Sequence, residues 1–381
     1  MPPIGEGWPP PQPPQGVPPG YGPSPGYGPP PGYGPPPGYG PPPGYGPAPY
    51  YGPPPGYPQQ PMELRPGVIP LRPLTLSDLY NGAVGFIRTN PKASLGLTAI
   101  VVILTQTLAL ILQLGPMQQL ATADPESTAF GTAFVDSVWT ELPGMLISAL
   151  AAIVLTGMLT VVVGRAVFGS PISIGETWYR IRDRILALIG VTLLVSLAYV
   201  VLILVAVVVI AALAAAAGTM AAALIGIPLA LVAVAAMLWI SVVTAFAPVI
   251  VVLERQPILA SLARSYALIR GDFWRVLGIW LLTRVVTYLV AMAVAVPFML
   301  AAVIAGGLVG ASSTAITVAA LLATVGAIVG QIITTPFTAG VTVLLYTDRR
   351  IRAEAFDLVL RTGATTNPAD PQSTDHLWWS R

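Results

Sequence analysis

Three long blocks of almost uncharged sequence constrain this chain more than any other feature. The first, residues 93–164, contains no Lys or Arg; the second, 185–253, contains no charge; the third, 276–347, contains only Arg284. A transmembrane helix needs about 20 apolar residues to cross a hydrocarbon core of about 30 Å. Each block of roughly 70 residues is therefore long enough for two spans and a turn.

Glycine, proline and polar residues indicate where each block turns. The first block has a polar stretch that opens with Gly115 and Pro116 and runs to Pro143, the second is interrupted at Gly218, and the third has a Gly/Ser-rich segment that starts at Gly306. We therefore predict an all-α integral membrane fold with six transmembrane helices, arranged as three helical hairpins. The predicted spans lie near 94–114, 144–164, 186–214, 222–250, 277–304 and 316–345.

The composition supports a membrane class and leaves little material for catalysis. Charged residues make up 9% of the chain, where a soluble domain has about a quarter. There is no Cys, which excludes disulfides and thiolate metal sites, and the one histidine, His376, lies in a polar segment. We therefore predict no catalytic, cofactor-binding or metal-binding residues.

The basic residues predict the orientation in the membrane. All but one of the 18 Lys and Arg residues lie in the four segments that six spans would place on a single side, and the turns on the other side carry none. Basic residues in short loops stay cytoplasmic. We therefore expect a multi-pass protein of the cell (plasma or inner) membrane with both termini in the cytoplasm.

The N-terminal segment differs from the rest of the chain. Its PPPGYG units place tyrosines six residues apart, and proline and glycine together prevent a regular helix or sheet. We expect a disordered cytoplasmic tail that is either a spacer or a docking strip for a cytoplasmic protein; almost without charge, it has no means to bind nucleic acid. The expected parts are a tail at 1–62, a membrane domain at 63–362 and a short C-terminal tail at 363–381.

One short pattern recurs before the first span of each hairpin. An Ile-Arg pair is followed, nine residues after the Ile, by a glycine at the entrance to the span. Three copies in phase with the hydropathy indicate a repeated unit. The pairs of Ile and Gly are Ile87 and Gly96, Ile181 and Gly190, and Ile269 and Gly278.

Each inner segment also has the spacing of an amphipathic helix. The first starts near Leu76 and ends at Pro91; the second opens with a capping box at Ser173-Ile-Gly-Glu176. A third runs from Ile258 towards Gly271, and a fourth pattern follows the last span at 351–358. These interfacial helices either pack beneath the spans and aim them, or form a cytoplasmic collar that binds anionic headgroups. The collar candidates are Arg88, Arg182 and Arg270.

The most distinctive inner segments read RPLTLSDLYNGAVGFIRTNPK, LERQPILASLARSYALIRGDFWRVLGI and LLYTDRRIRAEAFDLVL. They resemble landmarks of a bacterial family, the membrane domain of glycerophosphoryl diester phosphodiesterases, and the resemblance covers residues 65–362. It implies a multi-pass membrane protein. In two-part relatives a separate soluble barrel, with histidines and metal-binding carboxylates, performs hydrolysis. With one histidine, this sequence resembles the membrane part alone, which implies placement in a membrane without phosphodiesterase activity.

Two places inside the predicted spans are candidate sites. Arg284 either snorkels to the inner surface or faces inward to bind a phosphate or carboxylate, helped by Thr283 or Thr287. The run Gln331–Thr338 is either an ordinary kinked span or a polar site of a transporter. Its candidate residues are Gln331, Thr334, Thr335 and Pro336. The nearby Gly326-x-x-x-Gly330 pattern predicts a helix-packing face.

These observations favour a non-catalytic membrane protein, a scaffold or lipid-interacting bundle whose tail recruits cytoplasmic partners. The alternative is a transporter or lipid-translocating protein with its site around Arg284 and Gln331–Thr338. An intramembrane enzyme is disfavoured because no acid/base pair lies within the spans. The expected partners are membrane lipids with anionic headgroups.

Overall fold

The computed structural model describes residues 67–70, 72–122, 128–170, 172–309, 312–359 and 377–379. The predicted N-terminal tail and His376 lie outside these residues, as does most of the C-terminal segment. Within the described ranges the chain is helical and forms no strand. This confirms the all-helical class.

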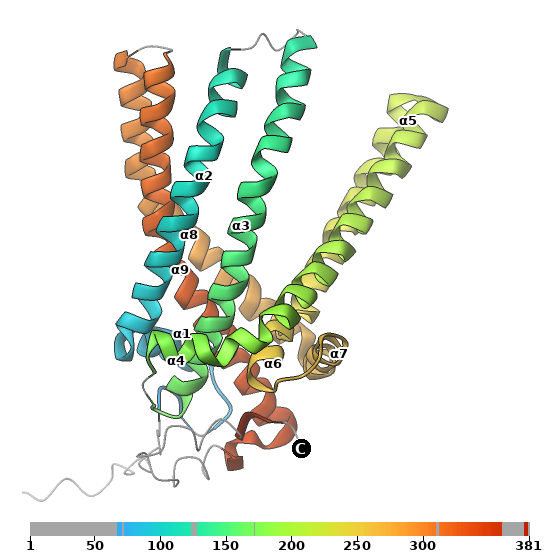
Figure 1. The fold of residues 1–381 in the computed structure, drawn as a ribbon. Coiled ribbons are helices and arrows are strands. Elements are labelled where there is room, and N and C mark those ends of the chain that lie inside the picture. The colour runs from blue at the N-terminus through green and yellow to red at the C-terminus, as the bar shows by residue number, and fades with distance from the viewer. Residues whose placement is uncertain are drawn as a thin grey trace, which may run out of the picture. The chain divides into compact units, whose positions relative to one another are not determined.

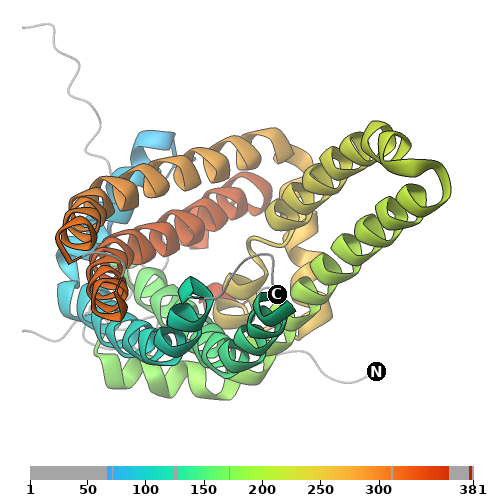
Figure 2. The same ribbon diagram turned by 90° about the horizontal axis from the view of Figure 1, so that it is seen from above.

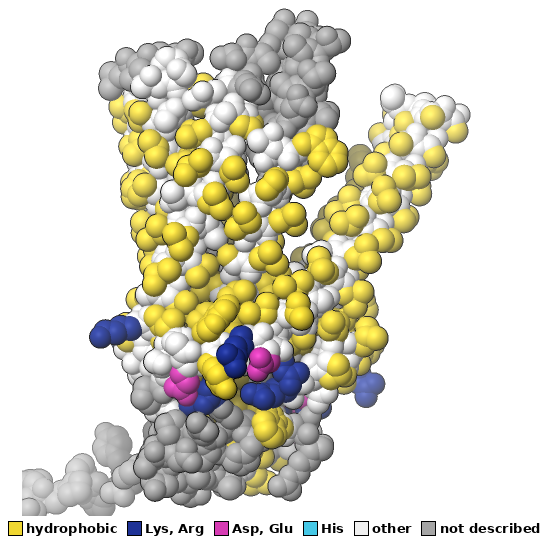
Figure 3. Space-filling view, viewed as in Figure 1, with side chains coloured by type: hydrophobic (Ala, Val, Ile, Leu, Met, Phe, Trp, Pro, Cys, Tyr) yellow, Lys and Arg dark blue, Asp and Glu magenta, His cyan; other side chains and the backbone are white. Residues whose placement is uncertain are grey.

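Long apolar helices make up most of the described chain. In Figure 1 they rise from a common base, and the belt of hydrophobic side chains in Figure 3 covers them above that base. Among the described residues, five helical stretches are long and apolar enough to cross a membrane, one of which combines everything from Ile174 to Leu253. The long helices are α2 (Leu97–Thr122), α3 (Thr128–Val167), α5 (Ile185–Val243), α8 (Phe273–Val309) and α9 (Ser313–Glu354).

Helix α5 is a hairpin of two helical legs. Gly218 breaks it with φ 83° and ψ 170°, a conformation that a residue with a Cβ rarely adopts. Figures 1 and 2 both show the two legs side by side, leaning away from the other long helices. Where the legs meet, a Cβ added to Gly226 would lie 3.3 Å from Ile210. The turn therefore falls at the predicted glycine.

The two helices of the first hairpin extend further than the sequence predicts. Pro116 lies inside α2, which continues to Thr122, and Pro143 lies inside α3, which begins at Thr128. A proline within a helix removes one backbone hydrogen bond, whereas a helix end leaves several backbone groups without an intrahelical partner. The polar stretch expected to be a long turn is therefore largely helical.

Short helices form the base. They are α1 (Leu76–Thr89), α4 (Ile174–Ile181), α6 (Ala247–Leu253) and α7 (Ile258–Ile269). The amphipathic helices predicted for the first three inner segments are therefore present as α1, α4 and α7. The fourth is not a separate helix: α9 continues without interruption to Glu354, and Ala355 ends it at φ 51°.

The start of α1 shows how the base is held. Thr75 and Asp78 form a full capping box that the sequence analysis missed. The predicted box at Ser173 is half formed, because the Ser173 side chain accepts from the Glu176 N–H at 3.2 Å while the Glu176 carboxylate pairs with Arg165 at 2.7 Å. An acid that looks like a cap in the sequence instead joins α4 to α3.

The Ile-Arg-Gly repeat has a structural counterpart in two of its three copies. Helices α4 and α7 end at the Ile of the repeat, a three-residue 3-10 turn follows, and then α5 or α8 begins. In the first copy α1 runs two residues further, and a π-helical turn at Lys92–Gly96 leads into α2. Only Gly190 is crowded: a Cβ there would lie 2.3 Å from Ile258, whereas Gly96 and Gly278 have open space.

Close helix packing centres on α9. Gly326 and Gly330 face Phe298 and Ala291 of α8, which confirms the predicted packing face. Nearer the base, Gly340 faces α1, where a Cβ would lie 2.4 Å from the ring of the fully buried Phe86. Helix α9 therefore packs against α8 at Gly326 and Gly330, and against α1 at Gly340.

The charged residues gather at the base below the apolar belt, as Figure 3 shows. Two fully buried carboxylates organise them. Asp348 accepts from the N–H of Leu74 at 2.7 Å and pairs with Arg275 and Arg352. The second is the carboxylate of Glu254, which accepts from Arg264 at 3.3 Å and from the hydroxyl of Tyr346.

A C-terminal segment docks onto this base. Trp378 is buried, and its ring stacks on Tyr346 with centroids 6.3 Å apart and lies 5.2 Å from Phe356. The carbonyl oxygen of Trp378 accepts a hydrogen bond of 3.0 Å from Arg350. The neighbouring Trp379 is half exposed, with a side chain 49% accessible. Residues 377–379 are therefore part of the folded base.

Candidate functional site

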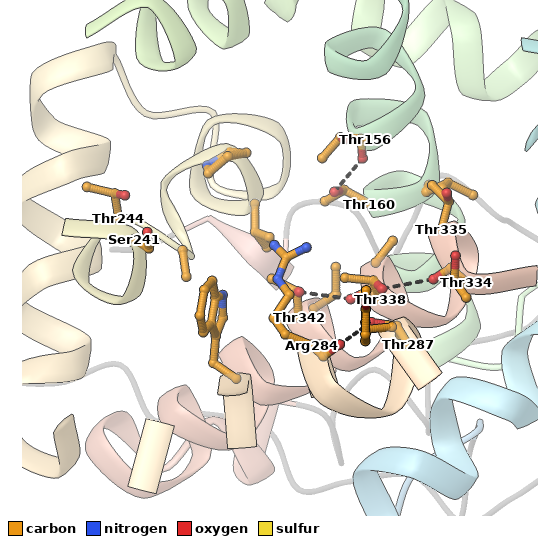
Figure 4. A pocket seen from close by; sticks show the side chains of 18 of the residues that line it. Thr156, Thr160, Ser241, Thr244, Arg284, Thr287, Thr334, Thr335, Thr338 and Thr342 are labelled. Carbon is orange, nitrogen blue, oxygen red and sulfur yellow. Dashed lines mark hydrogen bonds between the residues drawn. The ribbon is translucent and has the colours of Figure 1, made fainter. Parts of the chain in front are cut away.

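A cavity of about 820 Å³ lies between α3, α5, α8 and α9, with the turn after α5 and the start of α6 as part of its wall. This volume falls within the range of ligand sites in proteins. The cavity is partly enclosed, and hydroxyl side chains dominate its polar wall (Figure 4). Its polar and aromatic lining residues are Thr156, Thr160, Tyr199, Ser241, Thr244, Trp280, Arg284, Thr287, Tyr288, Thr334, Thr335, Thr338 and Thr342.

Arg284 carries the charge of this wall. Its side chain extends between the Ser241 and Thr244 side and the α9 threonines (Figure 4), and its guanidinium carbon lies 5.0 Å from the centroid of the Trp280 ring. Among the described residues no carboxylate forms an ion pair with it. It lies nine residues beyond Arg275 of the base, which is about 13 Å along the helix axis.

The hydroxyl groups on α9 follow from its sequence spacing. Thr334, Thr338 and Thr342 are four residues apart, so they lie on one face of the helix. Each hydroxyl donates to the carbonyl oxygen four residues earlier at 2.8 Å. This local bonding satisfies the hydroxyl proton within an apolar environment and leaves the oxygen lone pairs towards the cavity.

The structure brings together part of the predicted site. Arg284, Thr334 and Thr335 line the same cavity. Gln331 is half-buried and Pro336 is buried, and neither lines it. Of the two predicted helpers of Arg284, Thr287 lines the cavity, whereas the hydroxyl of Thr283 lies 3.2 Å from that of Tyr80 on α1 and the side chain is buried.

The predicted collar arginines lie elsewhere. Arg88, Arg182 and Arg270 are exposed at the base and do not line the cavity. Arg182 lies 4.1 Å from the centroid of the Tyr179 ring. Many of the other basic residues of the inner segments are held in ion pairs with base carboxylates. These are Arg72, Arg165, Arg180, Arg264, Arg275, Arg349, Arg350 and Arg352.

Several cavity residues were not anticipated from the sequence. Thr156 and Thr160 come from α3, and Tyr199, Ser241 and Thr244 come from α5 and the turn that ends it. The i, i+4 spacing of Thr156 and Thr160 indicates that they share one face of α3, and this could have been predicted from the sequence. The meeting of these helices around Arg284 could not, because nothing in one sequence says which spans are neighbours.

The described residues hold no group of three or more His, Cys, Asp or Glu side chains that could bind a metal ion. The polar wall of the cavity is instead made of a guanidinium, hydroxyls and an indole. Such a wall is able to bind and orient a ligand by hydrogen bonds and charge.

The apolar helices and the cavity within them define a multi-helix membrane protein. Residues 79–349 match the model of a family described as a domain of unknown function, DUF7847, and the chain belongs to this family. No curated protein and no solved structure matches the chain.

Proposed function

We propose that this chain is a non-catalytic membrane protein that binds an amphiphile with an anionic head in the cavity around Arg284. The observation that carries the proposal is Arg284 itself, a cation on a cavity wall with no carboxylate partner among the described residues. The Arg284 side chain is exposed at the partly enclosed cavity, among long apolar helices. An unpaired charge at that depth of a membrane is costly, and a bound anion offsets that cost.

The position of the cavity favours a ligand from the membrane. Its walls belong to helices of the apolar belt, and it is only partly enclosed. A lipid can leave its chains among the surrounding lipids while its head enters such an opening. We therefore assign the lipid-interacting role expected from the sequence to one site, the cavity around Arg284.

The topology is part of the same proposal. We infer six spans, with α5 supplying two, and both termini in the cytoplasm of a cell with this protein in its plasma membrane. The break at Gly218 supports two spans in α5, and the gathering of basic residues at one end of the belt supports the orientation. Recruitment of a partner by the N-terminal tail, and the resemblance to phosphodiesterase membrane domains, stay predictions.

Native mass spectrometry of the delipidated protein in mild detergent tests the proposal, with phosphatidylglycerol as the probe. We expect one tightly bound lipid per chain, and Arg284→Ala should weaken its binding at least tenfold, because a hydrogen bond to a charged group contributes about 1.5–3 kcal/mol. Arg182→Ala removes an exposed arginine of the base and should leave this lipid bound. Equal binding by wild type and Arg284→Ala, with both folded, would contradict the proposal.

The depth of the cavity favours a second candidate, a transporter or lipid-translocating protein. Thr338 lies ten residues before the base carboxylate of Asp348, about 15 Å along α9, which is close to half of a hydrocarbon core of about 30 Å. A lipid headgroup bound at Thr338 would therefore lie near the middle of the bilayer and not at the surface of either leaflet. Reconstituted vesicles with a fluorescent phosphatidylglycerol distinguish the two: translocation that Arg284→Ala abolishes supports transport, and binding without translocation supports the first candidate alone.

A further inference from the structure

The hydroxyl groups of the cavity differ in whether they still have a proton to donate. A serine or threonine hydroxyl has one proton, and a backbone carbonyl oxygen can only accept. Seven of the lining hydroxyls donate that proton to a carbonyl of their own helix at 2.7–2.8 Å and therefore present only lone pairs. One of them, Thr287, lies on α8, and the other six lie on α3, α9 and the end of α5. These six are Thr160, Ser241, Thr244, Thr334, Thr338 and Thr342.

The hydroxyl of Tyr199 also donates its proton within the protein, in this case to Ser241. This hydroxyl lies 2.8 Å from the hydroxyl oxygen of Ser241. Because the Ser241 proton is already given to the carbonyl of Met237, Tyr199 is the donor of this pair. The α5 side of the cavity, like the α9 face, therefore presents mainly hydrogen-bond acceptors.

The donors of the cavity are concentrated on α8. Trp280, Arg284 and Tyr288 lie on successive turns of that helix and line the cavity. The indole N–H of Trp280 and the hydroxyl of Tyr288 have no hydrogen-bond partner among the described residues, and the guanidinium has no ion pair there. The α8 wall thus carries the positive charge and most of the donors, with Thr287 as an acceptor among them, and we call it the donor wall. The α9 and α5 walls present mainly acceptors, with Thr335 of α9 still able to donate, and we call them the acceptor walls.

We propose that the cavity selects a phosphate-bearing amphiphile whose phosphate is joined to a group with N–H or O–H donors. The phosphate lies against the donor wall at Arg284, and the donor-bearing group, an ammonium or a polyol, faces the acceptor wall at Thr338 and Thr342. This inference rests on the proposed function and adds the identity of the second half of the head. A phosphate with a donor-free substituent leaves the acceptor wall unpaired, which is costly.

Two lipid pairs with identical acyl chains test the inference by native mass spectrometry. Phosphatidylethanolamine has N–H donors and phosphatidylcholine has none, at equal charge; phosphatidylglycerol has hydroxyls and phosphatidylmethanol has none, again at equal charge. We expect the donor-bearing member of at least one pair to bind on the order of tenfold more tightly. The pair that shows the preference identifies the donor as ammonium or polyol.

Variants show whether the preference arises at the acceptor wall. The double variant Thr338→Val/Thr342→Val keeps side-chain shape, removes two acceptors and should bring the affinity ratio close to one. Thr324→Val is the matched control, because Thr324 has the same bond to its own helix, at 2.8 Å, but does not line the cavity. A preference that survives in the double variant contradicts the assigned wall.

The outcomes separate this inference from the proposed function. Ratios near one in both pairs, with binding still lost in Arg284→Ala, would overturn the donor requirement and leave the anion site standing. Binding that is indifferent to Arg284→Ala in every lipid would overturn the proposed function itself. Soluble phosphoethanolamine should bind far more weakly than the lipid, and equal affinity would contradict an amphiphilic ligand.

Discussion

The backbone N–H of Leu74 donates a hydrogen bond of 2.7 Å to the carboxylate of Asp348, 274 residues later in the chain. The carbonyl oxygen of Leu74 accepts from Arg275 at 2.8 Å and from Arg352 at 3.2 Å. Both arginines also pair with Asp348. One buried carboxylate thus joins the segment before α1 to the start of α8 and the end of α9.

Asp348→Asn should destabilise the base. The amide would keep one acceptor but would leave Arg275 and Arg352 without their negative partner, and breaking a buried ion pair costs about 3–5 kcal/mol; because both arginines are partly exposed, we expect about 2–3 kcal/mol. The thermal unfolding midpoint in detergent should fall. Asp183→Asn, at a side chain that is 79% exposed, should leave the midpoint unchanged, and equal midpoints for the two variants would contradict this role.

Gly340→Ala should loosen the contact between α1 and α9. The new methyl group would lie 2.4 Å from the Phe86 ring, and overpacking of this kind costs about 1–3 kcal/mol. Thermal unfolding measures the loss, and Phe86→Leu in the same chain should recover part of it. Gly278→Ala is the matched control in α8, where the added methyl meets nothing within 4 Å. A similar loss at both glycines would argue against a specific contact.

Trp378→Ala should release the C-terminal segment from the base. The ring is 3% exposed and packs on Tyr346 and Phe356, and truncation of a buried tryptophan costs about 3–5 kcal/mol. Limited proteolysis after residue 359 should accelerate, because the released segment is more accessible. Trp379→Ala should have little effect, since that side chain is half exposed. Cleavage of Trp378→Ala at the wild-type rate would show that the stack does not hold the segment.

Single cysteines should report the orientation, because the chain has none of its own. Trp139 on α3 is 68% exposed and lies 26 residues from Arg165 of the base, about 39 Å along the helix. Trp139→Cys should react with a membrane-impermeant maleimide from outside the cell, and Ala263→Cys on α7 only after the membrane is opened. The reverse pattern would place the base outside and overturn the proposed topology.

Local features of the fold could be predicted from the sequence. The apolar blocks, the glycine turn at Gly218 and the amphipathic helices of the base depend on residues close together in the chain. Pro116 and Pro143 misled the prediction. Each removes one backbone hydrogen bond from its helix, whereas a helix end leaves several backbone groups without an intrahelical partner. A proline alone therefore does not locate a turn.

Contacts between distant segments could not be predicted. The number of basic residues in each inner segment could be read from the sequence. Their carboxylate partners, such as Asp348 for Arg275, could not, because they depend on which helices are neighbours. The same holds for the cavity: Arg284 and Thr334 were candidates in isolation, whereas Thr160 and Ser241 became site residues only when α3 and α5 were placed beside α8 and α9. One sequence contains no information on that arrangement beyond hairpin adjacency.

The first leg of the α5 hairpin, residues 185–217, is about 50 Å long at 1.5 Å per residue. This exceeds a hydrocarbon core of about 30 Å, so in the proposed topology the leg tilts, extends beyond the core or locally thickens the bilayer. Tyr199 on that leg lines the cavity together with residues of α8. A change in tilt therefore changes the width of the opening, and we expect the thickness of the host bilayer, set by acyl-chain length, to tune how tightly the ligand is held.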